Sequence, residues 1–421
     1  MKRFRWLFIA LLIALPLGLG GLLRERSSWR PRTLWEGRAP VENVIFSRDG
    51  NWLAASIGQG RGPARLLAPR LYVWNAHSLA PRHDIPVDLR LVDMDRFFIK
   101  DLWLSPDNQM LAVRIADNYY GRSSKIVLWD MNTGRKLYVL DNIESMVFSS
   151  DSRYLTGVKG SFGGSWRRPE PDVVVYHARS GKVARAFNLH PPRKRFFYGY
   201  DPSASGSGSG VGYSLSPDGR WVAVHLKKAS ARPDHYITES GGSLLVDTTG
   251  QQATRFLSQE SLQIFSHDGR KMLMTSSSDS RESDAEPTQR IRNTQNGQLL
   301  WKCKLPTNGY GSEFSPDNSL LLTSEGEVHS LHETRTGRLR AKLQGGPSAY
   351  HWHFSPDGSW LGNTGIDSYD TRALIWDAKT GQLARRLKAH RRPLNDIAFS
   401  PDGSTVATAS LDGSLKLWRL R

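Results

Sequence analysis

Two short patterns contain residue types that could do chemistry. His351 and His353 are one residue apart, so in a strand both would point to the same face and could share a metal ion. The segment Gly206–Gly210 (GSGSG) has the letters of the turn that carries a hydrolase nucleophile. Neither pattern is complete, because no third ligand accompanies the histidines and no helical segment follows the serine. The sequence therefore predicts no catalytic residue and no metal ligand.

Cysteine and phosphate-binding motifs are equally uninformative. Cys303 is the single cysteine of the 421-residue chain, so neither an intramolecular disulfide nor a thiolate metal cluster can form. The Gly/Ser-rich run at 205–212 lacks the Lys-Ser/Thr that follows a phosphate-binding loop and is typical of a flexible linker. We expect no cofactor.

One stretch does suggest a binding surface. Residues 190–200 (HPPRKRFFYGY) place three basic side chains beside four aromatic ones, a mixture that suits a charged partner anchored by stacking. The alternative is a loop whose aromatics pack against the domain while its charges are solvated. The candidate partner-binding residues, from this stretch and a neighbouring loop, are Trp166, Arg167, Arg168, Arg193, Lys194, Arg195, Phe197 and Tyr198.

The elements that must position such loops come from a repeat. An apolar residue, Ser and a turn of the Pro-Asp-Gly type occur eight times, each before a strand-like run such as WLAAS or WVAVH. The copies are Phe46–Gly50, Leu104–Asn108, Phe148–Ser152, Leu215–Gly219, Phe265–Gly269, Phe314–Asn318, Phe354–Gly358 and Phe399–Gly403. We call these the SPDG turns. A second phrase, an aromatic residue and a polar turn ending in Gly, alternates with them, as in Trp129–Gly134 (WDMNTG) and Trp376–Gly381 (WDAKTG). Each repeat therefore predicts four antiparallel strands, which is one propeller blade.

The repeat resembles the WD40 family, most clearly over residues 389–418 (AHRRPLNDIAFSPDGSTVATASLDGSLKLW). The resemblance implies a hydrogen-bond tetrad that ties the blade together, formed here by His390, Ser410, Asp412 and Trp418. Elsewhere the set is degraded, because the Trp position holds Tyr176, Arg292 or His332 in other repeats. The resemblance covers nearly everything after the N-terminal segment and implies a fold rather than an activity.

The expected fold is an all-β, WD40-like propeller of eight four-stranded blades, with seven as the alternative if the unit around Ser276–Gln298 is an insertion. Because the chain stops just after Trp418, the last unit lacks a fourth strand, and Arg32–Gly37 (RTLWEG) is expected to supply it and close the ring. Long loops are expected between second and third strands or between blades, at one end of the ring: Gly58–Arg70, Lys159–Asp172, Ala229–Gly242, Ser276–Gln289 and His190–Tyr213. Insertions gathered at one end favour that end as the binding face.

The N-terminus is expected to be a separate segment, residues 1–28, ahead of a propeller over 29–421. Residues 6–23 carry no charge and follow a basic start, which favours an uncleaved, single-pass membrane anchor over a cleaved signal peptide. The propeller would then lie outside the cytoplasm, either on the membrane or, after cleavage, secreted or periplasmic.

Three classes of function follow from these patterns. The first is a non-catalytic, monomeric interaction scaffold that binds a protein partner through the loops. The second is a polyanion binder for nucleic acid or anionic lipid, suggested by the net charge of +17. The third, an enzyme with a site in the central channel, has no supporting motif in this sequence.

Overall fold

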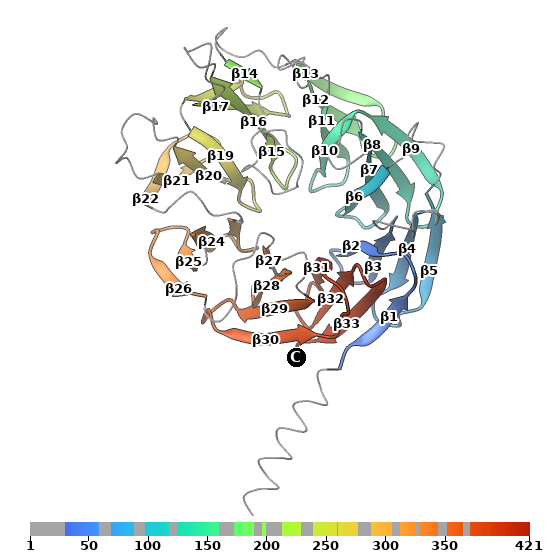
Figure 1. Ribbon diagram of the computed structural model, residues 1–421. Helices are drawn as coiled ribbons and strands as arrows, with labels where there is room; N and C mark the ends of the chain where they lie inside the picture. The colour runs from blue at the N-terminus through green and yellow to red at the C-terminus, as the bar shows by residue number, and fades with distance from the viewer. Residues whose placement is uncertain are drawn as a thin grey trace, which may run out of the picture.

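Eight β-sheets are arranged around a central axis in the computed structural model (Figure 1). The structure describes residues 30–58, 69–87, 97–117, 124–159, 172–188, 196–198, 213–228, 239–258, 260–276, 288–304, 312–325, 328–343, 352–364 and 371–421. Each sheet is one antiparallel blade, with its first strand nearest the axis except in the sheet of β14 to β18, where β15 lies nearest the axis (Figure 1). The expected eight-bladed propeller is confirmed.

The blades follow one another in chain order. Blades 1 to 4 contain β2 (Val41–Phe46), β3 (Trp52–Ile57), β4 (Arg70–Asn75) and β5 (Pro81–Pro86); β6 (Phe97–Leu104), β7 (Met110–Asp117), β8 (Ser124–Asp130) and β9 (Lys136–Asp141); β10 (Ile143–Phe148), β11 (Tyr154–Lys159), β12 (Asp172–His177) and β13 (Val183–Asn188); and β14 (Phe196–Tyr198), β15 (Tyr213–Leu215), β16 (Trp221–Lys228), β17 (Glu239–Asp247) and β18 (Arg255–Ser258). Blades 5 to 8 contain β19 (Glu260–Phe265), β20 (Lys271–Ser276), β21 (Thr288–Asn293) and β22 (Leu299–Lys304); β23 (Glu313–Phe314), β24 (Leu320–Glu325), β25 (Val328–Glu333) and β26 (Leu339–Lys342); β27 (Trp352–Phe354), β28 (Trp360–Thr364), β29 (Arg372–Asp377) and β30 (Leu383–Lys388); and β31 (Leu394–Phe399), β32 (Thr405–Ser410), β33 (Ser414–Arg419) and β1 (Arg32–Glu36).

The ring closes through the N-terminal strand, as predicted. Strand β1 pairs antiparallel with β33, with Arg32 opposite Leu417 and Glu36 opposite Ser414. It therefore supplies the outer strand of blade 8 and covers an edge that would otherwise be exposed. The unit around Ser276–Gln298 is a complete blade (β19 to β22), so eight blades are confirmed and the seven-bladed alternative is wrong.

A repeated hydrogen-bond pattern explains why the SPDG phrase recurs. In blade 1 the Ser47 hydroxyl donates to Asp49 at 2.5 Å and accepts the amide of Trp52 at 2.8 Å. The same carboxylate accepts the amide of Asn51 at 3.0 Å, so one Ser and one Asp satisfy the polar groups of the whole turn. The Ser–Asp bond occurs in every blade, with the pairs Ser105–Asp107, Ser149–Asp151, Ser216–Asp218, Ser266–Asp268, Ser315–Asp317, Ser355–Asp357 and Ser400–Asp402.

The hydrophobic core lies between neighbouring blades. One cluster joins Leu322 and Leu331 of blade 6 to Trp352 and Trp376 of blade 7. Another joins residues of blade 1, including Val41 and Leu53, to Ala407 and Leu415 of blade 8. Because apolar surface is buried between the last and first blades as well, closure contributes to stability in the same way as every other blade contact.

Strand order separates the two ends of the ring. The SPDG turns and the turns between third and fourth strands lie at one end, here called the turn end. The connections between second and third strands and between blades lie at the other, here called the loop end. Four predicted long loops fall between second and third strands, as expected, namely Gly58–Arg70, Lys159–Asp172, Ala229–Gly242 and Ser276–Gln289, although residues 239–242 of the third belong to β17.

Blade 4 departs from the expectation. Residues 190–213 were predicted to be an inter-blade loop, but Phe196–Tyr198 forms β14, which pairs with the far end of β16, while β15 pairs with the near end. The first strand of this blade is thus built from two pieces, both paired with the eight-residue strand β16.

The N-terminal segment, residues 1–28, lies outside the described residues. Within the ranges that the structure describes, no helix has the length and apolar character needed to span a bilayer.

Candidate functional site

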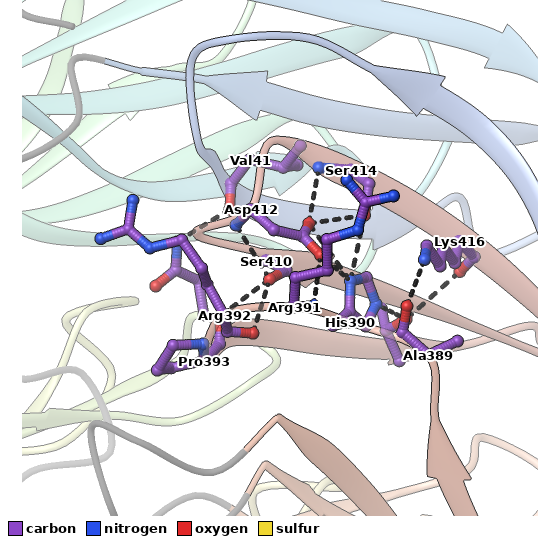
Figure 2. A network of polar contacts seen from close by, with 12 residues as sticks. Val41, Ala389, His390, Arg391, Arg392, Pro393, Ser410, Asp412, Ser414 and Lys416 are labelled. Atoms are coloured by element: carbon purple, nitrogen blue, oxygen red, sulfur yellow. Dashed lines mark hydrogen bonds and ion pairs between the residues drawn. The ribbon is translucent and has the colours of Figure 1, made fainter.

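A buried polar network occupies the loop end of blade 8 (Figure 2). His390 lies in the connection from β30 to β31, and Asp412 lies in the turn between β32 and β33. His390 Nδ1 is 3.2 Å from Asp412 Oδ2, and His390 Nε2 is 2.7 Å from the Thr408 hydroxyl. Trp418 Nε1 donates to the same hydroxyl at 2.9 Å. The network therefore runs from the carboxylate through the imidazole and the hydroxyl to the indole.

The hydroxyl that links His390 to Trp418 belongs to Thr408, a residue that the sequence analysis missed. Ser410 was assigned to the tetrad, but its hydroxyl donates to the carbonyls of Arg392 at 3.0 Å and Pro393 at 2.9 Å. It also accepts the amide of Asp412 at 3.1 Å. The two hydroxyls stand two residues apart on the same face of β32, so alternation alone could have indicated Thr408 as a second candidate.

The protonation of the network follows from its donors. Burial lowers the pKa of His390 below its usual value, against the attraction of Asp412. Burial works against the charged form of Asp412, but hydrogen bonds from Ser414 and from the amide of Arg391 outweigh it and hold its pKa low. Because Thr408 Oγ1 already accepts the indole N–H, its own proton is available to His390 Nε2. A neutral imidazole that donates from Nδ1 to Asp412 satisfies every group.

A hydroxyl, an imidazole and a carboxylate in this order resemble a hydrolase triad, but burial removes the nucleophile from any substrate. Thr408 is 0% exposed and His390 7%. An attacking hydroxyl also needs an adjacent space for the acyl group, whereas Thr408 is bonded to the indole of Trp418. The arrangement joins the inter-blade connection to β32 and β33 and is structural.

Two of the blades that lack Trp at this position form other polar contacts there. In blade 5 the Trp position holds Arg292, which donates to the buried carboxylate of Glu260 at 2.7 Å, and Arg290 pairs with the same carboxylate. In blade 6 it holds His332, whose Nδ1 is 3.3 Å from the carbonyl of Gly337. The degraded tetrad is thus replaced locally by other polar contacts.

Polar side chains on the innermost strands connect adjacent blades. Asp101 on β6 pairs with the buried Arg114 on β7 at 2.6 Å, and Arg114 donates to the carbonyl of Glu144 in blade 3. In blade 6, Glu313 accepts the amide of Phe354 in blade 7 at 3.3 Å. Burial raises the pKa of Glu313 to about 8. Glu313 therefore contacts the next blade directly, whereas Asp101 is linked to the next blade through Arg114.

No group of three or more metal-ligating side chains occurs among the residues that the structure describes. Of the two histidines considered at the sequence level, His353 is exposed on β27, and His351 lies outside the described residues.

The predicted partner-binding residues fall mostly beyond the described ranges. Residues 166–168 and 193–195 lie outside them. Phe197 and Tyr198 lie on β14, opposite Lys227 and Leu226 of β16.

The blades and their turns define an eight-bladed β-propeller. The family model "WD domain, G-beta repeat" matches residues 381–419, which run from the last turn of blade 7 through β33. Over nearly the whole chain the fold resembles the solved "Structure of Dos1 propeller", with a TM-score of 0.60, 14% sequence identity, and coverage of 93% of this chain and 95% of that one. The fold is therefore that of an eight-bladed β-propeller, and the stretch that forms most of its last blade is similar to the WD40 repeat.

Curated relatives match shorter stretches. A "Periodic tryptophan protein 2 homolog" of Neurospora crassa is 34% identical over 65 residues, which is 15% of this chain and 7% of that protein. The "Serine-threonine kinase receptor-associated protein" of Gallus gallus is 26% identical over 107 residues, 25% of this chain and 30% of that protein. The chain therefore spans less than a third of either relative's length, and the likeness concerns the repeat.

Proposed function

We propose that this protein is a non-catalytic scaffold that binds a protein partner through the loop end of its propeller. WD40 propellers generally bind proteins, and their homologues are mostly non-catalytic. The observation that carries the proposal is the asymmetry of the two ends. Eight short, internally bonded SPDG turns occupy the turn end, whereas all of the long connections open at the loop end. Variable loops on a rigid ring suit recognition.

Crosslinking from matched positions tests this choice of end. A photo-crosslinking residue at Phe197 is expected to capture a protein partner in cells, whereas the same residue at the exposed Thr336 of the turn end is not. Substituting Arg193, Lys194 and Arg195 by Ala should slow association and weaken its salt dependence, because charge steers the encounter. The matched control replaces the exposed basic residues of the turn end, Arg335, Arg338 and Lys379. If the turn-end control loses capture of the partner and the loop-end variant keeps it, the partner binds at the turn end and the proposal is wrong.

We further propose that residues 6–23 tether the ring to a membrane, with the propeller outside the cytoplasm. Their uncharged sequence supports a span, and the direction of β1 suits a tether. Arg32 pairs with Leu417 toward the turn end and Glu36 with Ser414 toward the loop end. The preceding chain thus joins the ring at the turn end and leaves the loop end free. Retention of the intact chain in carbonate-washed membranes is the expected result. A soluble protein whose sequence begins near Gly21 would show cleavage instead.

A second function, polyanion binding, is favoured by the net charge of +17 alone. Its signature is a steep fall of affinity for nucleic acid or anionic vesicles with rising salt.

A further inference from the structure

Three exposed arginines surround one tight turn at the loop end. Arg391 and Arg392 lie in the connection from β30 to β31, and Arg38 lies in the connection from β1 to β2. The turn is Leu411–Gly413, between β32 and β33. We call the three side chains the arginine cluster.

Asp412 and Ser410 of the buried network hold the main chain of Arg391 and Arg392 (Figure 2). The amide of Arg391 donates to Asp412 Oδ2 at 2.9 Å, and the Ser410 hydroxyl donates to the carbonyl of Arg392 at 3.0 Å. The amide of Leu411 also donates to the carbonyl of Pro393 at 3.0 Å. Both arginines are therefore presented from a held backbone, which lowers the conformational entropy lost on binding.

Arg38 is held against the other side of the same turn. The amide of Gly37 donates to the carbonyl of Gly413 at 3.0 Å. The carbonyl oxygen of Ala39 lies 3.1 Å from where a Cβ on Gly413 would stand. The residues on either side of Arg38 thus pack directly on the turn that also holds Arg391, and this brings together arginines more than 350 positions apart in the sequence.

The guanidinium groups of the cluster form no ion pair with the carboxylates described around them. Both carboxylate oxygens of Asp412 are occupied, Oδ1 by Ser414 at 2.6 Å and Oδ2 by His390 and the Arg391 amide. Glu42 is 3.5 Å from the side-chain amide of Asn395. Within the part of the chain that the structure describes, no ion pair joins Arg38, Arg391 or Arg392 to a carboxylate.

We infer that the arginine cluster binds an acidic segment of the partner protein, with its carboxylates paired to the guanidinium groups. This inference rests on the proposed partner-binding role of the loop end. A guanidinium matches a carboxylate with two parallel hydrogen bonds, and three of them on a fixed backbone select for closely spaced Asp or Glu side chains. A compact cluster around one turn suits a short peptide segment better than a nucleic-acid duplex, which needs charges along an extended track. The chain that precedes β1 joins the ring at the turn end, which is opposite to the cluster. If that chain tethers the ring, the cluster faces away from the membrane.

The test uses the whole protein and defined probes. A fluorescein-labelled hexa-glutamate peptide is titrated by anisotropy, with a hexa-glutamine peptide, a short DNA duplex and phosphatidylserine vesicles in parallel. The triple variant Arg38→Gln, Arg391→Gln, Arg392→Gln is compared with the turn-end triple Arg335→Gln, Arg338→Gln, Lys379→Gln, which removes the same charge. We expect the first variant to lose at least about tenfold in affinity for the glutamate peptide and the second to stay within about twofold.

Equal loss in both variants, no loss in the first, or tighter binding of the duplex or the vesicles would overturn the inference. Melting curves show whether either triple variant is still folded. If one is not, the corresponding single substitutions are measured in its place. The two proposals fail in distinguishable ways. If crosslinking assigns the partner to the turn end, the proposed role of the loop end falls, and a glutamate peptide that still requires the cluster then shows an anion site that this partner does not use. If partner capture requires the loop end but not the cluster, the scaffold stands and this inference falls.

Discussion

The carboxylate of Asp396 in blade 8 accepts the main-chain amide of Val44 in blade 1 at 2.9 Å, although the two residues are 352 positions apart. Closure of the ring therefore has two polar parts: β1 pairs with β33 on the outside, and Asp396 joins the innermost strands on the inside. The inner contact is partly buried. Burial raises the pKa of Asp396 to about 7, and the nearby charge of Asp101 adds to this, against the hydrogen bonds from Val44 and Ile397.

This raised pKa gives stability a pH dependence of definite sign. A carboxyl group with a pKa of about 7 in the folded state and about 4 in the unfolded state binds more protons when folded. Its contribution is therefore complete below about pH 4 and is lost as pH rises through 7. We expect Asp396→Asn, which keeps an acceptor for Val44, to flatten the fall in stability between pH 5 and 8.

Urea unfolding across that range measures the effect. The difference between the two curves reports Asp396 together with its coupling to Asp101, because buried histidines such as His329, whose pKa burial lowers to about 4, contribute equally to both. Asp402→Asn is the control, since hydrogen bonds beginning with that of Ser400 lower the pKa of Asp402 to about 2 and it stays charged throughout. Parallel curves for the native protein and Asp396→Asn would contradict the prediction.

Thr408 is expected to matter through its hydroxyl rather than its volume. Thr408→Val preserves the shape but leaves His390 Nε2 and Trp418 Nε1 without their partner. Two buried, unpaired groups should cost about 1–3 kcal/mol of unfolding free energy. Thr408→Ser retains the hydroxyl and should cost less. Chemical denaturation of the two variants decides the matter, and a valine variant as stable as the serine variant would show that the hydroxyl is dispensable.

The local repeat made the fold predictable, and contacts between distant segments made the site harder to predict. The hydrogen bonds of the SPDG turn in blade 1 are local, because the Ser47 hydroxyl bonds to Asp49 and to the amide of Trp52. The sequence pattern therefore predicts the same turn wherever it occurs. The sequence could not decide whether Ser410 or Thr408 bonds to His390. Both hydroxyls lie on the same face of the strand, and only the position of His390 in the structure distinguishes them. The proximity of Arg38 to Arg391 depends on ring closure and has no local signal.

Removing β1 should destabilise the ring far more than removing the segment before it. Deletion of residues 1–38 exposes the edge of β33 and removes Trp35, whose ring lies 4.4 Å from that of Tyr72 in blade 1. Deletion of residues 1–28 leaves both contacts in place. We expect the longer deletion to melt several degrees lower than the shorter one. Equal melting temperatures would mean that β1 contributes nothing to closure.

Gly413 is expected to be irreplaceable because it combines a strained backbone with close packing. Its φ is +81°, and a Cβ there would collide with the carbonyl oxygen of Gly37, which belongs to the segment that carries Arg38. Gly358 provides a matched control, with a φ of +71° and no atom within 4 Å of an added Cβ. Alanine at either position should incur the left-handed backbone cost of about 1–2 kcal/mol.

Only Gly413→Ala must also push the Gly37–Ala39 segment off the turn and break its hydrogen bond to Gly37. We therefore expect it to melt lower than Gly358→Ala and, where it remains folded, to bind the hexa-glutamate peptide more weakly because Arg38 has moved. Differential scanning fluorimetry and the peptide titration measure the two effects. If both variants lose the same stability and bind the peptide equally well, the packing of the Gly37–Ala39 segment against Gly413 supports neither ring closure nor the arginine cluster.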